Sequence, residues 1–184
     1  MKKSDIRKRI FKIRKKKYLK NLCINFKNLV KVLKSKKLQK GIIGGYYPYN
    51  HEINIIHILE KLEKSHYKIS LPKIEKKFKM NFFSWSYRDP LIINKYGIPE
   101  PISNKVLLPD ILLVPLVAYD ENKNRIGYGG GFYDKTFSKL KQLNLVFYTV
   151  GFAYDDQKQD KLPVEKFDYK LDFVLTEKQL YTFL

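Results

Sequence analysis

The sequence has little cysteine and no long apolar run. Cys23 is the one cysteine among 184 residues, which excludes an intramolecular disulfide and a zinc site built from cysteines. The sequence has no run of 18 consecutive apolar residues, so no transmembrane helix is expected. Residues 1–9 are basic but lack the apolar stretch of a signal peptide. The hydrophobic content of 44% is nevertheless enough for a core. We therefore expect a soluble cytoplasmic protein with a single domain, residues 1–184.

Acidic residues are scarce as well, with 18 Asp and Glu against 37 Lys and Arg, for a formal net charge of +19. Residues 1–40 hold 17 basic residues and one acid, Asp5, a net of +16, whereas the rest of the chain carries only +3. Such a segment can bind phosphates, RNA or an acidic membrane surface. A charge run is more often a solvated helix face. A basic RNA- or polyanion-binding module without catalysis therefore stays open as an alternative function.

Apolar residues within this basic segment recur at helical spacing, so we expect helices there. One stripe consists of Ile6, Ile10 and Ile13, and a second of Leu19, Leu22, Phe26, Leu29 and Leu33. Residues 15–17, all lysine, separate the two stripes and predict a break or a bend. Ser4 or Asp5 is expected to cap the first helix, and Cys23 is expected to be buried within the second stripe.

After residue 40 the pattern changes to short apolar runs that alternate with helical patterns. Strands are predicted at residues 41–47, 67–71, 79–85, 111–114, 145–151 and 173–175, and helices at residues 52–62 and 133–143. Residues 111–114 are all apolar, as in the centre of a parallel sheet, and Pro72 is expected to end the strand before it. Strands alternating with helices predict an α/β domain with a mostly parallel central sheet.

The most informative segment is rich in glycine. Residues 125–134 read Arg-Ile-Gly-Tyr-Gly-Gly-Gly-Phe-Tyr-Asp and contain four of the nine glycines. Glycines let backbone N–H groups approach an anion closely, and the N-terminus of the following helix adds a favourable dipole. Arg125 adds a cation, and Asp134 adds a carboxylate suited to Mg²⁺. We favour a phosphate-binding loop over a flexible turn without a ligand.

Two familiar phosphate-binding loops are excluded at this segment. The segment lacks the Gly-Lys-Ser/Thr ending of a Walker A loop. Phe132 also stands where the dinucleotide fingerprint has its third glycine.

Together with residues 114–120, the glycine segment resembles the signature of the 5-formyltetrahydrofolate cyclo-ligase family, also called methenyltetrahydrofolate synthetases. Leu116 and Lys135 stand where the family usually has glycine and arginine, but no glycine or charged candidate is lost. Other matches follow in order along nearly the whole chain: Lys3-Ser4-Asp5-Ile6-Arg7, Tyr46-Tyr47-Pro48 with Glu52-Ile53, Leu71-Pro72, Met80-Asn81-Phe82, Gly97-Ile98-Pro99-Glu100-Pro101 and Asp172.

This resemblance implies a fold and a reaction. The expected fold has three layers, α/β/α, with a mostly parallel central sheet like that of the NagB/RpiA/CoA-transferase-like proteins, and a basic N-terminal helical segment packed on it. The expected reaction is the ATP- and Mg²⁺-dependent cyclisation of 5-formyltetrahydrofolate to 5,10-methenyltetrahydrofolate, through an imino-phosphate, with release of ADP and phosphate. The expected partners are these small molecules, with no membrane or nucleic acid, and the expected state is a monomer.

The resemblance also implies roles for individual residues. ATP would be bound by Lys3, Ser4, Asp5, Ile6, Arg7, Arg125, Ile126, Gly127, Tyr128, Gly129, Gly130, Gly131, Phe132 and Tyr133. The folate would be bound by Arg7, Tyr47, Glu52, Tyr128, Gly129, Gly130, Gly131 and Phe132, and Mg²⁺ by Asp134 and Asp172. Spacing alone favours a different role for Glu52, as an acid facing the dipole at a helix N-terminus. The resemblance places it on the pterin instead.

Overall fold

A seven-stranded sheet forms the middle of the fold in this computed structural model, which describes residues 2–20, 22–75 and 79–182. Five neighbouring strands run parallel, and the strand at each edge is antiparallel to its neighbour. The expected α/β fold with a mainly parallel central sheet is therefore confirmed. In spatial order the strands are β11 (Leu180–Thr182), β10 (Phe173–Leu175), β9 (Tyr148–Phe152), β6 (Ile111–Pro115), β1 (Ile42–Gly44), β2 (Lys68–Glu75) and β3 (Lys79–Ser84).

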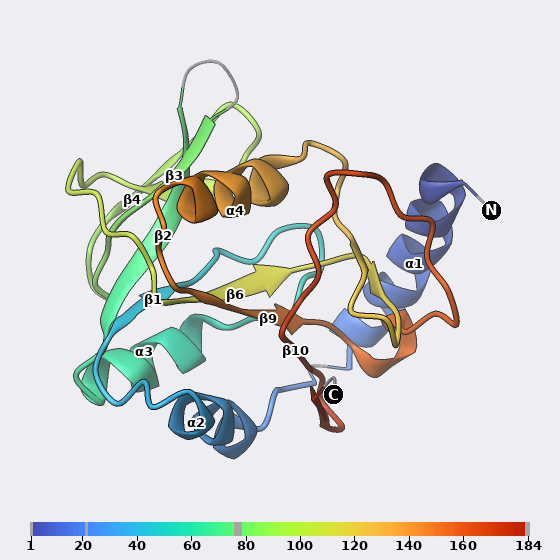
Figure 1. Cartoon of the computed structure of the whole chain (residues 1–184), viewed down its shortest axis with the longest axis horizontal. Coiled ribbons are helices and arrows are strands. Elements are labelled where there is room, and N and C mark those ends of the chain that lie inside the picture. The colour runs from blue at the N-terminus through green and yellow to red at the C-terminus, as the bar shows by residue number, and fades with distance from the viewer. Residues whose placement is uncertain (1, 21, 76–78, 183–184) are drawn as a thin grey trace.

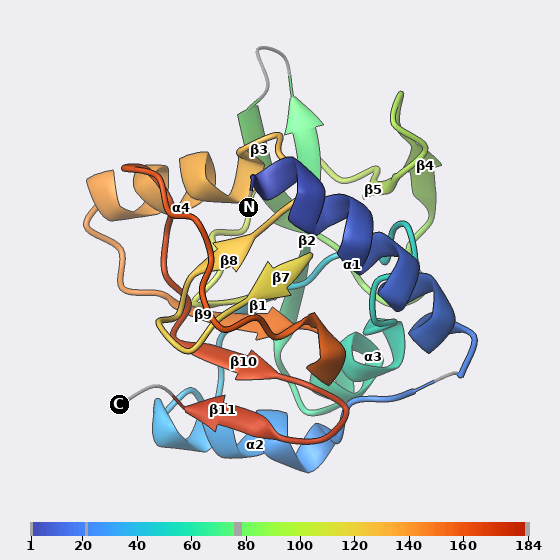
Figure 2. The same cartoon turned by 90° about the vertical axis from the view of Figure 1, so that its right-hand side faces the viewer.

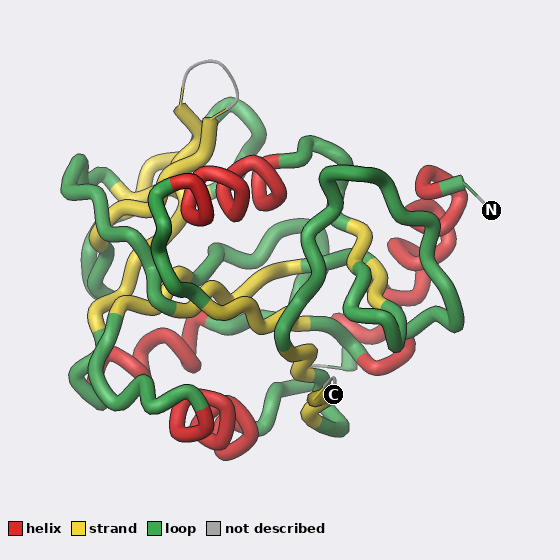
Figure 3. Tube along the Cα trace, viewed as in Figure 1, coloured by secondary structure: helices red, strands yellow, loops and turns green. Residues whose placement is uncertain are grey.

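Helices cover both faces of this sheet (Figure 1). α4 lies on one face, and α2 and α3 lie on the other, while α1 lies to one side; Figure 3 shows the same arrangement by element type. The bounds are Lys3–Tyr18 for α1, Phe26–Ser35 for α2, Ile56–Lys64 for α3 and Phe132–Gln142 for α4. None of the helices in the described part of the chain is both long and apolar enough to cross a membrane.

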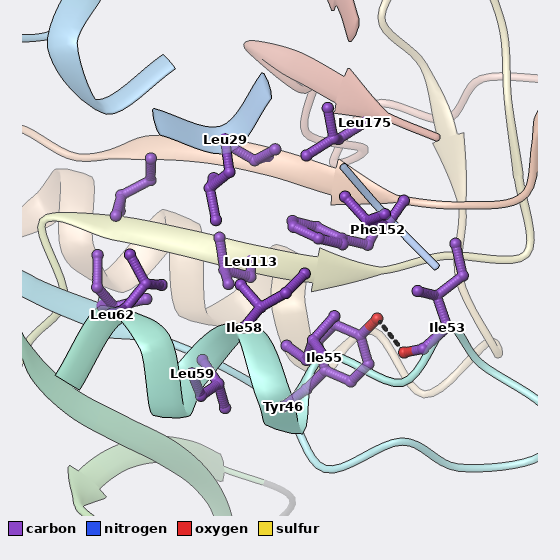
Figure 4. Close-up of a cluster of buried hydrophobic side chains, with 14 of the residues drawn as sticks. Leu29, Tyr46, Ile53, Ile55, Ile58, Leu59, Leu62, Leu113, Phe152 and Leu175 are labelled. Carbon is purple, nitrogen blue, oxygen red and sulfur yellow. Dashed lines mark hydrogen bonds between the residues drawn. The ribbon is translucent and has the colours of Figure 1, made fainter. Parts of the chain in front are cut away.

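Burial of β6 on both faces joins the two helical layers. Ile111 and Leu113 belong to the apolar cluster that contains α2 and α3 (Figure 4), and Leu112 and Val114 belong to the cluster that contains α4. Successive side chains of a strand point to opposite faces, so a strand covered on both faces needs apolar residues throughout. This explains why the run at residues 111–114 does not alternate with polar residues.

The basic segment forms two helices, as expected, but the second is shorter than its apolar stripe predicts. Asn25 accepts a hydrogen bond from the Lys27 N–H (3.0 Å), so α2 begins at Phe26. The predicted start of this helix at Leu19 is wrong, because Leu19 is 77% exposed and precedes α2. Cys23 is exposed, so its expected burial is also wrong.

α1 packs beside a two-stranded hairpin, β7 (Ala118–Tyr119) and β8 (Arg125–Ile126), as Figure 2 shows. Ile6 and Ile10 of α1 are buried in one cluster with Ala118 and Ile126 of the hairpin. The N-cap of α1 is Lys2, so the expected cap is wrong: Ser4 and Asp5 both lie inside the helix, where the Asp5 carboxylate accepts the Lys2 N–H (3.3 Å). The packing sets the start of α1 beside the glycine segment, which directly follows β8.

Two element boundaries differ from the prediction for local reasons. α3 begins at Ile56, whose N–H is accepted by the Asn54 side chain (3.0 Å), so Glu52 precedes the helix. β2 continues through Pro72, because β1 pairs with it only up to Ser70. On the β3 side, Pro72 lies opposite Phe82, whose carbonyl oxygen accepts the Leu107 N–H (3.0 Å). Phe82 therefore needs no donor from β2, and the missing N–H of Pro72 breaks no hydrogen bond between the strands.

Additional strands were not predicted from the sequence. A hairpin of β4 (Leu91–Ile93) and β5 (Pro99–Pro101) projects from the β2–β3 side, and β11 adds the antiparallel edge. A short 3₁₀ helix, η2 (Asp155–Gln157), follows β9. Each of these elements has only three residues, which is too short for a periodic pattern of apolar residues to appear in the sequence.

Leu113→Ala is expected to lower the free energy of unfolding by about 2–5 kcal/mol, because it leaves a cavity in the cluster between β6, α2 and α3. Urea unfolding of the two proteins measures this difference. Val146→Ala serves as the control, since Val146 is 79% exposed and its truncation leaves no cavity. Equal losses for the two variants would contradict the placement of β6 at the centre of the core.

Candidate active site

A cavity of about 990 Å³ opens at the carboxyl ends of β1 and β6, the edge where open α/β sheets bind their ligands. Its wall combines the start of α1, the loop after β1, the glycine segment with the start of α4, the β4–β5 hairpin and the loop before β10. The predicted residues that line it are Lys3, Arg7, Tyr47, Glu52, Arg125, Ile126, Gly127, Tyr128, Gly129, Gly130, Gly131, Phe132, Tyr133 and Asp134.

The glycine segment passes close to α1 in a conformation that side chains disfavour. Gly129 has φ +109° and Gly131 has φ +65°, both in the left-handed region. A Cβ atom on Gly129 would lie 3.4 Å from the Arg7 guanidinium carbon. Gly131 is also the N-cap of α4, so the unpaired N–H groups at the start of that helix face the cavity. The arrangement suits an anion.

Two cations reach the cavity from α1. The Nε of Arg7 donates to the Gly127 carbonyl oxygen (2.8 Å), which ties the helix to the glycine segment. The Nζ of Lys3 lies 2.7 Å from Asp168 and 3.1 Å from Glu165. Burial acts to lower the pKa of Lys3, but its hydrogen bonds to these two carboxylates outweigh burial and raise it. Lys3 is therefore a firmly protonated group at the cavity wall.

Arg125 is held inside the wall and fixes Asp134. Its side chain is 4% exposed, and its Nη1 lies 2.9 Å from the Asp134 Oδ1 and 3.2 Å from the Tyr169 carbonyl oxygen. The Tyr169 N–H donates to the same Oδ1 (3.0 Å), and the Phe137 ring lies beneath the guanidinium. These contacts orient the Asp134 carboxylate in the first turn of α4, where the helix dipole also stabilises its negative charge.

Glu52 is a buried carboxylate in the cavity lining. It is 5% exposed and accepts the Tyr49 N–H (2.9 Å). Burial raises the pKa of Glu52 to about 7, although the positive charge of Arg14, the Tyr49 N–H and the Tyr128 hydroxyl act to lower it. Because α3 begins four residues later, the expectation from spacing, an acid at a helix N-terminus, is wrong. A group poised between its two charge states inside a cavity is typical of a functional site.

Four of the predicted residues lie outside the cavity lining. Ser4 and Asp5 are on the exposed face of α1, and Ile6 is buried against the β7–β8 hairpin. Asp172 lies before β10, where its carboxylate accepts from the N–H (2.7 Å) and the hydroxyl (2.8 Å) of Thr149. The structure does not bring Asp172 to the cavity beside Asp134, and the role of both at Mg²⁺ stays a prediction.

The β4–β5 hairpin supplies cavity residues to which the sequence assigned no role. Glu100 is buried and accepts from the Ile74 N–H (2.8 Å) and the Asn94 side chain (2.7 Å), which holds the hairpin against β2. The family-like match at residues 97–101 was the available signal, but it carried no chemistry by itself. Lining residues without a predicted role include Asn94, Tyr96, Ile98 and Glu100, together with Lys135, Ser138 and Lys139 of α4 and Asp168.

The comparison with protein families identifies the family to which this chain belongs. The 5-formyltetrahydrofolate cyclo-ligase family matches residues 1–177. The chain belongs to this family. It is therefore a ligase, and the expected family and cyclo-ligase activity are confirmed.

Cyclo-ligases from other organisms resemble the chain along most of its length. The 5-formyltetrahydrofolate cyclo-ligase of Escherichia coli K12 is 32% identical over 146 residues, covering 76% of this chain and 79% of that protein. The cyclo-ligase of Haemophilus influenzae is 35% identical over 140 residues, covering 72% and 74% of the two chains.

Solved structures share the fold. The NMR structure of the Aquifex aeolicus 5,10-methenyltetrahydrofolate synthetase is similar with a TM-score of 0.77, 25% identity and coverage of 100% of this chain and 93% of that one. The Mycoplasma pneumoniae 5,10-methenyltetrahydrofolate synthetase has a TM-score of 0.71, 23% identity and coverage of 96% and 99%. The cyclo-ligase fold therefore extends over the whole of this chain.

Glu52→Gln is expected to stabilise the protein at neutral and alkaline pH. The pKa of Glu52 is raised from 4.5 to about 7, so the folded state binds the proton more tightly and stability falls as pH rises between these values. Above this window the buried charge costs about 3 kcal/mol, which glutamine avoids. Urea unfolding of both proteins at about pH 5 and pH 8 measures the effect, which should be small at pH 5.

The control for this comparison is Glu121→Gln, because the Glu121 side chain is 72% exposed and pairs with Lys158 at the surface. It should change stability by at most ~1 kcal/mol at either pH. A Glu52→Gln protein that is less stable than the wild type at pH 8 would contradict the buried, high-pKa carboxylate.

Proposed function

We propose that this cavity cyclises 5-formyltetrahydrofolate to 5,10-methenyltetrahydrofolate, with ATP as the second substrate, ADP and phosphate as products and Mg²⁺ as the metal. The observation that carries the proposal is the shape of the cavity. The cavity is lined by a glycine loop suited to an anion, by two cations of α1 and by the buried carboxylate Glu52. The same cavity could thus hold the phosphates of ATP and a pterin ring that donates hydrogen bonds.

The phosphate end is formed by the glycine loop, the start of α4 and the cations of α1. The formyl oxygen attacks the γ-phosphorus of ATP, the bond to ADP breaks, and an imino-phosphate forms. The N10 amine then attacks the formyl carbon and loses its proton, and the C–O bond breaks to release phosphate. Phosphoryl transfer depends mainly on positioning and charge stabilisation. Arg7, Lys3 and the amides of Gly129–131 would supply both, and Ser4, Asp5 and Ile6 would act only through the first turn of α1.

The folate end is formed by Glu52 and its neighbours. A pterin presents adjacent ring N–H and amino donors, which an ionised carboxylate accepts as a pair of charge-assisted hydrogen bonds. Tyr47 lines the cavity near this carboxylate and gives an aromatic surface for the ring. The hydroxyl of Tyr133 is buried without a hydrogen-bond partner in the part of the chain that the structure describes, so it is free to bond to a ligand.

The donor set at the phosphate end fits Mg²⁺. This ion usually keeps several waters and takes one or two protein carboxylates together with substrate phosphates. Among the described residues no cluster of three or more His, Cys, Asp or Glu side chains could hold a metal alone, in keeping with a metal that arrives with the nucleotide. Asp134 would hold the ion, and Asp172 would need to leave Thr149 to join it. When bound, Mg²⁺ neutralises phosphate charge.

Other properties follow from the sequence and are proposed with this function. The protein would be a cytoplasmic monomer with one domain over residues 1–184, related in fold to the NagB/RpiA/CoA-transferase-like proteins. Nucleic acid would not be a partner. Lys8, Lys12, Lys15 and Lys16 lie on the exposed face of α1, where they act as a solvated surface with a positive potential near an anion-binding cavity. The basic RNA-binding alternative is not needed to explain them.

The wild-type protein, incubated with 5-formyltetrahydrofolate, ATP and Mg²⁺, is expected to produce the near-ultraviolet absorbance of methenyltetrahydrofolate and one ADP per turnover. Omission of ATP or addition of excess EDTA should abolish both signals. A folded preparation that binds ATP but forms no methenyl product would overturn the proposal.

Asp134→Asn is expected to lower kcat/KM by at least ~100-fold, on the scale of a lost phosphoryl-transfer contact. The amide oxygen can still accept from Arg125 and from the Tyr169 N–H, so the wall should stay folded while the charge is removed. The exposed Asp160 provides the control, and Asp160→Asn should keep wild-type activity. Steady-state kinetics at saturating Mg²⁺ compare the three proteins, and near-normal turnover of Asp134→Asn would remove this residue from the metal site.

A further inference from the structure

The inner face of α1 carries a third cation that the cavity does not explain. Lys3, Arg7 and Arg14 follow one another at helical spacing along the face that also buries Ile6 and Ile10. Arg14 is 1% exposed and is not among the residues lining the cavity. In the described ranges, residues 2–20, 22–75 and 79–182, it forms no ion pair with a carboxylate. A buried charge of this kind is costly, so its surroundings must use it or compensate for it.

Arg14 connects three segments that meet behind the cavity wall. Its Nη2 donates to the Asn50 carbonyl oxygen in the loop after β1 and to the Tyr128 hydroxyl in the glycine segment. The guanidinium also lies between two rings, 5.2 Å from the centroid of Phe11 and 5.1 Å from that of Tyr128. Its Nε and Nη1 are buried without a hydrogen-bond partner in the described structure, so these contacts do not neutralise the charge.

The contacts of Arg14 surround the turn that presents Glu52. Within this turn the Glu52 N–H donates to the Tyr49 carbonyl oxygen (3.1 Å), and the Tyr49 N–H donates to the Glu52 carboxylate (2.9 Å). The Tyr128 hydroxyl donates to the same Tyr49 carbonyl (3.2 Å). Arg14 therefore holds the turn at Asn50 and holds Tyr128 against it.

Electrostatics links Arg14 to the same carboxylate. The groups that face Glu52 come from four elements: Arg14 of α1, Tyr128 of the glycine segment, Tyr46 after β1 and Tyr133 of α4. Burial raises the pKa of all three tyrosines, so they stay neutral through the physiological range. Arg14 is thus the charged side chain of this set, and its field favours the ionised carboxylate.

We infer that Arg14 is a positioning residue for folate recognition, which fixes the turn at residues 49–52 and Tyr128 and favours the ionised form of the Glu52 carboxylate for the pterin. The inference rests on the proposed role of Glu52 as the pterin acceptor. Arg14 touches neither substrate; it acts through Glu52. Its removal is expected to change folate affinity in a pH-dependent way, while ATP affinity stays the same.

The test measures the Kd of 5-formyltetrahydrofolate by calorimetry between pH 6 and pH 9 for the wild type and Arg14→Met. Loss of the positive charge should raise the pKa of Glu52, and a rise of about one unit would lower the ionised fraction at pH 7 from about one half to about one in eleven. Affinity should therefore fall roughly fivefold or more at pH 7 and by less than about threefold at pH 9. Arg14→Lys keeps the charge and should keep the wild-type pH dependence.

Lys12→Met is the matched control, because it removes the same charge from the exposed face of α1 and should leave the Kd unchanged at every pH. A Glu52→Gln background gives the decisive comparison. There Arg14→Met should add no pH-dependent loss. A loss with no pH dependence at all, or a pH-dependent loss that persists in the Glu52→Gln background, would overturn the inference and leave Arg14 a purely structural residue.

A direct readout separates this inference from the proposed function. The carboxyl titration of Glu52, followed by NMR in protein labelled with ¹³C-glutamate, should shift to higher pH in Arg14→Met. If Glu52→Gln binds folate normally, the pterin role of Glu52 fails whatever this titration shows; if Glu52→Gln is impaired but the titration is unmoved, only the role of Arg14 fails. Arg14→Gln, which can still donate to Asn50, is made in parallel, and thermal unfolding verifies that the variants fold.

Discussion

Burial of β6 on both faces is the constraint on which the rest of this fold depends. Because Leu112 and Leu113 face opposite layers, α2 and α3 must cover one side of the sheet and α4 the other. Parallel strands in such a sheet direct their carboxyl ends to one edge, where the connecting loops collect. The loop after β1, the glycine segment and the start of α4 therefore meet there, and α1 closes the edge by packing on β7 and β8.

The sequence predicted what depends on local pattern or on a family-like motif. The continuous run at residues 111–114 predicted a central strand, and the glycine segment, singled out by its composition, lies in the cavity wall. Leu19 illustrates what a pattern cannot decide, since it has the right spacing for a helix that Asn25 caps only later. Glu52 illustrates a tertiary effect, because its burial depends on residues from other elements that spacing does not reveal. The β4–β5 hairpin joins the cavity through Glu100 and Ile74, a contact between segments that no local signal connects.

Charge has different roles on the two faces of α1. On the outer face, lysines are solvated and contribute a general positive potential. On the inner face, Lys3, Arg7 and Arg14 are each engaged with a different part of the cavity wall. The net charge of +19 thus describes the surface more than the cavity, whose wall contains a few engaged cations and the buried carboxylates Glu52 and Glu100. Glu52 is kept in a medium that disfavours its charge, as expected where function and stability conflict.

The ion pair between Lys3 and Asp168 joins residues 165 positions apart in the chain. A contact of such sequence separation closes a long loop, so it costs more chain entropy than a contact between neighbouring segments. During synthesis, the helix that carries Lys3 leaves the ribosome long before the segment that carries Asp168. The part of the cavity wall that Lys3 and Asp168 form is therefore complete only when segments from both ends of the chain are in place.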